Sequence, residues 1–242
     1  RDNYACFVTI GNARFTSNTA TNYGLYDVEG VDALYPLWYG EFMGYIASSG
    51  RSLALQDRIS AWFAPEIKNA SDWESPFVIN FLTLAGVKYI VTKDNFLPPP
   101  QISFNLVYGY KNWTIYSFRN PLPKATFMTV YEVIPSKEAL LRRLFDANFD
   151  PRKTILFFEV PAIKSDDSVQ GIAEVTSYQP QQIEIQSNSN GPGFVFVNDS
   201  YFPNWFALVD GKVTPVLQAD YTFRAVPIPS GRHQIILRYR YL

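Results

Sequence analysis

The sequence predicts an α+β protein in which a mixed α/β domain is followed by an antiparallel β-sandwich of the jelly-roll or Ig-like kind. The chain of 242 residues is longer than a typical single domain of about 100–150 residues. Aromatic residues make up 17% of it, which suits a β-rich core. Short strand-like segments at regular spacing fill its last third. We therefore expect two domains, over residues 1–164 and 165–242.

The first half of the first domain is predicted to combine short strands with helices. An apolar run over residues 5–10 indicates a strand in which Cys6 is buried. A loop leads into a short helix over residues 36–48. A second helix begins at Ser75-Pro76, ends at Gly86 and is followed by a strand over residues 87–92.

The second half of this domain is predicted to begin with a β-hairpin. Residues 106–110 and 113–119 are expected to face each other across Lys111-Asn112, which is a turn sequence. Residues 125–133 read as one strand, Ser136 caps a helix that runs to about residue 146, and residues 154–160 form another strand.

The second domain is predicted to follow a polar linker over residues 164–170. Such closely spaced strands favour a sandwich, with a small barrel as the alternative. Seven strands are expected, over residues 172–178, 182–187, 193–198, 205–209, 213–217, 222–227 and 233–239.

Composition excludes several classes of function. With 21 basic and 22 acidic residues and no block of like charge, the chain has no electrostatic signature of a nucleic-acid partner. Its apolar runs are shorter than the about 20 residues that cross a bilayer. The single cysteine excludes an internal disulfide. The chain opens at Arg1 without a signal-peptide pattern, so we expect it to begin inside a longer reading frame.

Catalytic and cofactor signatures are lacking in the sequence. The one histidine, His233, has no second histidine for a metal site and no serine or cysteine in a nucleophile motif, so we assign it a structural or solvated role. There is no glycine-rich phosphate loop. We therefore expect no cofactor, no metal and no catalytic residue.

The loop over residues 26–36 is the candidate site of the first domain. Three carboxylates, Asp27, Glu29 and Asp32, lie there beside Tyr26 and Tyr35. They could form an acid–base pair or ligands for a hard divalent ion. The spacing does not match an EF-hand, which favours the alternative that Asp27 and Asp32 cap turns. Asp27, Asp32 and Tyr35 are our candidates for glycan binding.

The candidate site of the second domain combines aromatic rings with planar polar groups. This is sugar-binding chemistry, because the apolar faces of a sugar stack on rings while its hydroxyls need hydrogen-bonding partners. The alternative is that Trp205 and Tyr201 fill the core and that Asp220 pairs with Arg224 across a turn. The candidate residues are Asn198, Asp199, Tyr201, Trp205, Tyr221 and Arg224.

Several sequence blocks carry a family resemblance. They are Phe-Val-Asn-Asp-Ser-Tyr-Phe-Pro-Asn-Trp at 196–205, Val-Asp-Gly-Lys at 209–212, residues 220–233, Leu-Thr-Leu-Ala-Gly-Val-Lys-Tyr-Ile-Val at 82–91 and Asp-x-x-Gly-x-Asp at 27–32. With these blocks the chain resembles the extracytoplasmic C-terminal region of the YfhO-like bacterial multi-pass membrane proteins. The membrane part of that family looks like a lipid-linked-sugar-dependent glycosyltransferase of the GT-C class.

The resemblance implies a place and a role. The chain would lie at the extracytoplasmic face of the bacterial membrane, joined to the transmembrane part of the same polypeptide. It would help to orient a lipid-linked sugar or a cell-envelope glycan acceptor, and it would not be catalytic alone, since the family's catalytic carboxylates look to lie in membrane loops that the chain lacks. The alternatives are a secreted carbohydrate-binding or adhesion module and a structural scaffold that binds no glycan.

Overall fold

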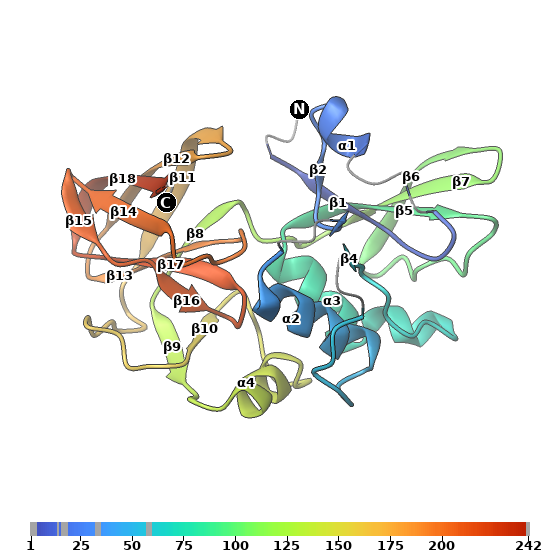
Figure 1. Cartoon of the computed structure of the whole chain (residues 1–242), viewed down its shortest axis with the longest axis horizontal. Helices are drawn as coiled ribbons and strands as arrows, with labels where there is room; N and C mark the ends of the chain where they lie inside the picture. The colour runs from blue at the N-terminus through green and yellow to red at the C-terminus, as the bar shows by residue number, and fades with distance from the viewer. Residues whose placement is uncertain (1–3, 14, 16–18, 32–34, 57–59, 241–242) are drawn as a thin grey trace. The chain divides into compact units, whose positions relative to one another are not determined.

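The computed structural model describes residues 4–13, 15, 19–31, 35–56 and 60–240. The chain divides into two compact units, each of which is described by itself (Figure 1). The N-terminal unit comprises Arg1–Leu122 and Phe145–Asn148, and the C-terminal unit comprises Pro123–Leu144 and Phe149–Leu242. No helix among the described residues is both long and apolar enough to span a membrane.

A five-stranded mixed sheet forms the framework of the N-terminal unit, in the order β2-β1-β5-β7-β6. Strand β1 runs parallel to β2 and β5, whereas β7 is antiparallel to β5 and β6. Two further short strands, β3 and β4, pair with each other. The bounds are β1 Cys6–Thr9, β2 Tyr26–Asp27, β3 Gly30–Val31, β4 Ser60–Ala61, β5 Val87–Lys93, β6 Phe104–Tyr110 and β7 Trp113–Phe118.

The two longer helices of this unit begin and end close to the predicted positions. Pro36 is the N-cap of α2, and Pro76 is the first residue of α3, where a proline ring fits because no intrahelical N–H partner is needed. The predicted helix at 36–48 and the predicted helix-strand pair at 75–92 are confirmed. The bounds are α1 Thr19–Asn22, α2 Leu37–Ala47, the 3₁₀ helix η1 Ala70–Glu74 and α3 Pro76–Leu84.

Aromatic packing joins α2 and α3. The ring of Phe81 on α3 stacks on Phe63 at 4.2 Å and lies 6.1 Å from Phe42 on α2. Gly44 allows α2 to lie against the following loop. Any side chain at this position would clash, since a Cβ would lie 2.0 Å from the carbonyl oxygen of Ala54. Close packing of this kind fixes the turn that follows α2.

The predicted hairpin is confirmed. Strands β6 and β7 pair antiparallel on either side of Lys111-Asn112, and Lys111 takes the left-handed conformation with φ 53°. The predicted burial of Cys6 is also confirmed, since it is 5% exposed in β1.

The C-terminal unit contains two sheets. The six-stranded sheet has the order β8-β13-β17-β16-β10-β9, and the five-stranded sheet has the order β11-β12-β18-β14-β15. One helix, α4 Lys137–Leu144, is capped by the Ser136 hydroxyl, which accepts the Ala139 N–H. The strands are β8 Ala125–Met128, β9 Val130–Val133, β10 Thr154–Phe157, β11 Gly171–Gln179, β12 Gln182–Ser189, β13 Gly193–Val197, β14 Trp205–Val209, β15 Lys212–Thr214, β16 Leu217–Ala219, β17 Phe223–Ile228 and β18 Gly231–Tyr239.

Two predicted strands are wrong, because each is split between different partners. Residues 125–133 form β8 and β9, which lie at opposite edges of the six-stranded sheet although only Thr129 separates them. Neighbouring strands lie about 4.8 Å apart and one residue spans about 3.5 Å, so this sheet must curl until its edges approach each other. Residues 213–217 divide at Pro215 between β15 of one sheet and β16 of the other.

A shared hydrophobic core lies between the two sheets. Val195 and Val197 of β13 and Val226 of β17 contribute to it from one sheet, and Ile185 and Ile235 contribute from the other. The alternate residues of β13 lie on the opposite face of the six-stranded sheet, where Phe194 packs against Phe157 and Tyr131. The chain is therefore β-rich with several antiparallel sheets, as predicted from the sequence.

Sheet pairing crosses the predicted domain boundary after residue 164. Strands β8, β9 and β10 precede this point, yet β8 pairs with β13 and β10 pairs with β16. A boundary at residue 165 stays a prediction, whereas the compact C-terminal unit already begins at Pro123.

Candidate functional site

A polar cluster closes one end of the core between the two sheets of the C-terminal unit. Asp199 lies at its centre, two residues after the end of β13. Its carboxylate contacts Lys124 at 3.3 Å and Arg224 at 3.9 Å, and it accepts hydrogen bonds from the Tyr178 hydroxyl at 3.0 and 3.1 Å. We call these four residues and Trp205 the Asp199 cluster.

Strand alternation explains why these side chains meet. Arg224 pairs with Val197 across β17 and β13, so its side chain lies on the face of the sheet that Val197 shares with the core. Trp205 lies on the same face of β14 as Ala207 and Val209, and it packs against the same core. Both residues therefore lie on the inner faces of their sheets, at the end of the strands.

Trp205 and Arg224 stack in this position. The guanidinium carbon lies 4.0 Å from the centre of the indole ring, and Nε donates to the carbonyl oxygen of Ser200 at 2.8 Å. Tyr239 lies edge-on to the same indole at 5.7 Å. The guanidinium group thus already occupies one face of Trp205.

Asp199 is the carboxylate that faces both cations of the cluster. The side chains of Lys124 and Arg224 are only 6% exposed, and that of Asp199 is 20% exposed. Burial opposes ionisation of Asp199, but the two cations and the Tyr178 hydrogen bond outweigh it and hold the pKa of Asp199 below its usual range. Asp199 is therefore an ionised carboxylate that partly reaches solvent.

The other three predicted residues of the second domain, Asn198, Tyr201 and Tyr221, have contacts of their own. Asn198 is buried and donates through Nδ2 to the carbonyl oxygen of Pro123 at 3.1 Å. Tyr201 is half-buried, and its N–H donates to Thr222. Tyr221 is fully buried beside Phe158, so its ring is not exposed to a ligand.

The expected pairing of Asp220 with Arg224 is wrong. Arg224 contacts Asp199 instead, and Asp220 accepts the Leu156 N–H at 2.7 Å while its own N–H donates to the Leu156 carbonyl at 2.9 Å. Asp220 is completely buried with φ 43°, and its Oδ2 has no hydrogen-bond partner within the described part of the chain. Burial raises the pKa of Asp220 to about 8, so it is protonated at neutral pH.

The candidate loop of the first domain is organised by Glu29, which the sequence did not single out as a site. Glu29 Oε1 accepts the Phe63 N–H at 2.8 Å, and Oε2 accepts the N–H and hydroxyl of Thr9 at 3.2 and 2.5 Å. Burial raises the pKa of Glu29 to about 7, against the effect of these hydrogen bonds. Glu29 therefore ties the loop to β1 and to the segment that follows β4.

Asp27 takes the turn-capping arrangement considered from the sequence. Its Oδ1 accepts the Glu29 N–H at 3.0 Å, and burial raises its pKa to about 6. Asp32 lies outside the described residues. Tyr35 is half-buried against α2, where a Cβ on Gly40 would lie 2.4 Å from its ring. The glycan-binding role of Asp27, Asp32 and Tyr35 stays a prediction.

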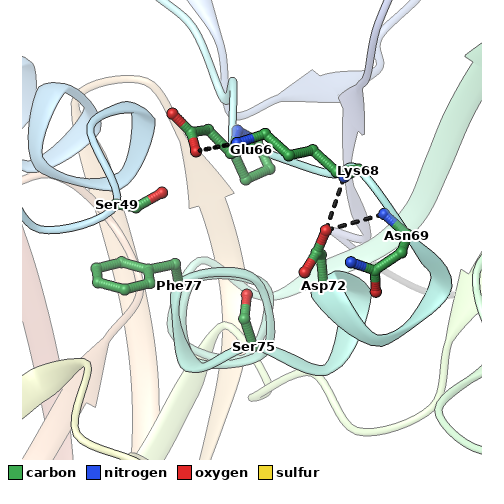
Figure 2. A pocket seen from close by; sticks show the side chains of 8 residues that line it. Ser49, Glu66, Lys68, Asn69, Asp72, Ser75 and Phe77 are labelled. Atoms are coloured by element: carbon green, nitrogen blue, oxygen red, sulfur yellow. Dashed lines mark hydrogen bonds and ion pairs between the residues drawn. The ribbon is translucent and has the colours of Figure 1, made fainter.

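A pocket of about 280 Å³ in the N-terminal unit was not predicted from the sequence (Figure 2). It lies between Ser49, in the turn after α2, and the corner where η1 passes into α3. Asn69, Asp72 and Phe77 are among its lining residues. No sequence motif marks it, because the two segments that form it are about twenty residues apart.

The possible metal ligands and the one histidine form no further site within the described residues. Across the described ranges, no group of three or more His, Cys, Asp or Glu side chains could hold a metal ion. His233 Nδ1 lies 2.6 Å from Asp210 Oδ2 at the surface, so its interaction is a local one between neighbouring strands.

The fold and the cluster describe a β-rich region with a polar cluster at one end of its core, and part of that region is similar to a family of bacterial membrane proteins. Residues 164–241 match the model of the family described as Bacterial membrane protein YfhO. This part of the chain, which contains Asp199, Trp205 and Arg224, is therefore YfhO-like, as the sequence resemblance predicted. No curated protein and no solved structure matches the chain.

Asp199 should be essential for the stability of the C-terminal unit. In Asp199→Ala, the buried cations Lys124 and Arg224 lose their shared carboxylate, and an uncompensated buried charge costs about 3 kcal/mol or more. Chemical denaturation followed by tryptophan fluorescence measures this loss. Glu132→Ala is the control, since its pair with Arg143 is more than 30% exposed on both sides and should cost less than about 1 kcal/mol. Equal losses in both variants would contradict the assignment.

Asp220 should make the unit less stable as pH rises. The folded state keeps the Asp220 proton up to about pH 8, whereas an unfolded chain releases it near 3.8. The folded state therefore binds more protons between these values, and its free energy of unfolding falls as pH rises through that window. Asp220→Asn keeps the acceptor for Leu156 but cannot titrate. We expect the wild type to lose stability relative to this variant between pH 5 and pH 8, measured by urea denaturation. Parallel curves would show that Asp220 is ionised in the folded protein.

Proposed function

We propose that this chain is an extracytoplasmic region of a larger bacterial membrane protein that resembles a lipid-linked-sugar-dependent glycosyltransferase of the GT-C class. Its role is to help hold the sugar donor or a cell-envelope polymer acceptor, without catalysing transfer itself. The observation that carries the proposal is the match of residues 164–241 to a family of bacterial membrane proteins. The transmembrane part of the same polypeptide is its proposed partner.

The chemistry of the Asp199 cluster supports a role in holding a glycan. Trp205, Tyr201 and Tyr178 are half-buried aromatic rings, and the Tyr178 hydroxyl contacts the ionised carboxylate of Asp199, which partly reaches solvent. A sugar needs an apolar surface for its C–H face and acceptors for its hydroxyls, and both are present here.

We also infer a finer description of the fold, in which the two sheets of the C-terminal unit form a β-sandwich. The shared core and the strand alternation in β13, β14 and β17 support this arrangement. The curl of the six-stranded sheet gives it a barrel-like side, so neither a jelly-roll nor an Ig-like topology is assigned.

A structural scaffold is the second candidate function. It is favoured by the inward position of Trp205 and by the number of partners that Asp199 already has, namely Lys124, Tyr178 and Arg224. In this case the cluster only joins the two sheets, and no glycan binds.

The extracytoplasmic position can be tested by cysteine labelling in whole cells. Val213→Cys places a thiol on a side chain that is 74% exposed, while the native Cys6 is buried and gives a low background. In the intact membrane protein, we expect a membrane-impermeant maleimide to label Val213→Cys without permeabilising the cells. Labelling only after permeabilisation would place the region in the cytoplasm, and recovery of the protein from the culture medium would favour a secreted module.

Glycan binding can be tested with soluble peptidoglycan and teichoic-acid fragments. We expect Trp205→Ala to weaken binding by about tenfold or more, because a stacked aromatic anchor is worth at least 1.4 kcal/mol. Binding is measured by isothermal titration calorimetry on folded protein. Trp113→Ala is the matched control, since its indole also carries a cation, Lys93, at 5.1 Å but lies in the N-terminal unit.

Outcomes of this titration separate the two candidate functions. If Trp205→Ala does not fold, Trp205→Leu is measured instead, because it fills part of the same inward space without an aromatic ring. Wild-type affinity in a folded Trp205 variant, or no binding by the wild type, would favour the scaffold.

A further inference from the structure

The pocket of the N-terminal unit offers a binding site that is independent of the Asp199 cluster. Its volume of about 280 Å³ is slightly below the range of about 300–1,000 Å³ that is typical of pockets for drug-sized ligands, so it suits a single small ring. It lies outside the region that matches the membrane-protein family.

One wall of this pocket is a fixed aromatic ring. Phe77 stacks on Phe145 at 5.0 Å with an interplanar angle of 20° and lies 6.1 Å from Tyr45. Gly50 leaves room for the ring, since a Cβ there would lie 3.0 Å from its outer atom. These neighbours hold Phe77 in one orientation, so the ring is ready to receive an apolar ligand face without rearrangement.

Polar groups face the pocket from the η1–α3 corner. Asn69 Oδ1 caps η1 by accepting from the N–H and hydroxyl of Ser71, and its amide group donates toward the Asp72 carboxylate. Asp72 Oδ2 accepts the N–H groups of Lys68 and Asn69, so the second carboxylate oxygen can accept from a ligand. Ser75 precedes α3, and its hydroxyl makes no capping bond.

Figure 2 shows how these groups are arranged, with the Phe77 ring at one side, Ser75 between it and Asp72, and Asn69 beyond Asp72 at the other side. An amide, a carboxylate and a hydroxyl thus line the same pocket as an aromatic ring. This combination suits a ring with several hydroxyl groups, because each hydroxyl both donates and accepts.

The charges of the pocket favour a neutral ligand. Glu66 pairs with Arg51 at 2.6 Å and with Lys68 at 3.2 Å. Hydrogen bonds from the backbone of Lys68 and Asn69 lower the pKa of Asp72, which is therefore ionised at neutral pH. An anionic ligand would meet both carboxylates, and Lys68 is already paired with one of them.

We propose that this pocket binds one neutral sugar ring, with Phe77 against its C–H face and with Asn69, Asp72 and Ser75 as the hydrogen-bonding residues. It is a second binding position in the chain and does not depend on a glycan at Trp205.

The test is a titration of the chain with methyl β-glucopyranoside and methyl β-N-acetylglucosaminide, followed by ¹H–¹⁵N NMR. We expect saturable shifts at the amides of Asn69, Ser75 and Phe77. Asn69→Asp keeps the capping oxygen but removes the amide donors, and Ser75→Ala removes a hydroxyl that caps nothing. Each variant should weaken binding by about threefold to tenfold, as for one lost hydrogen bond.

A matched control makes the result specific. Asn105→Asp introduces the same charge in the same unit but outside the pocket, beside Arg119, and should leave the affinity unchanged. Unchanged affinity in both pocket variants, or no shift at the pocket amides, would overturn the proposal. Tighter binding of glucuronate or glucose 6-phosphate at these amides would overturn the inference of a neutral ligand.

Trp205→Leu, which removes the aromatic ring at the Asp199 cluster, separates this site from the proposed function. If that variant keeps the shifts at Asn69 and Ser75, the pocket stands whatever happens at the Asp199 cluster. If it abolishes them, the pocket proposal fails, while a glycan site at Trp205 remains supported.

Discussion

The C-terminal unit depends on the charge of Asp199. Two cations, Lys124 and Arg224, come from the six-stranded sheet and are almost fully buried, so the fold requires a carboxylate between them. Tyr178 and Trp205 reach the same point from the five-stranded sheet. Because every group in the cluster contacts another one, the cluster joins the two sheets at this end of the core.

Strand β13 shows what this constraint achieves. Both of its faces are buried, with Val195 and Val197 toward the five-stranded sheet and Phe194 and Phe196 on the other face. A strand with no solvent-facing side must have its position fixed by groups at its ends, since the hydrophobic pattern alone does not choose between the two faces. Asp199 lies two residues after β13, and its ion pairs with Lys124 and Arg224 hold this end of the strand.

The elements that could be predicted from the sequence are those determined by neighbouring residues. The helix that begins at Pro76, the turn at Lys111 and strand β14 all have local signals, and all were found. The break at Thr129 had no local signal, because it follows from pairing with strands far along the chain. Pro215 did offer a signal, since proline cannot donate to a sheet. The cluster could be predicted only as a set of residue types, because Lys124 and Asp199 are 75 positions apart.

Two buried carboxylates of this unit show why chemical type alone does not locate a site. Asp220 is buried without a cation, so its pKa is raised and it serves as a neutral partner for the backbone of Leu156. Asp199 is buried beside two cations, so its pKa is lowered and it keeps a charge that partly reaches solvent. A neutral, fully enclosed carboxyl can only support the fold. An ionised carboxylate next to an aromatic ring can both support the fold and accept a ligand hydroxyl, which is why the Asp199 cluster, rather than the loop at Asp220, is the candidate site of this unit.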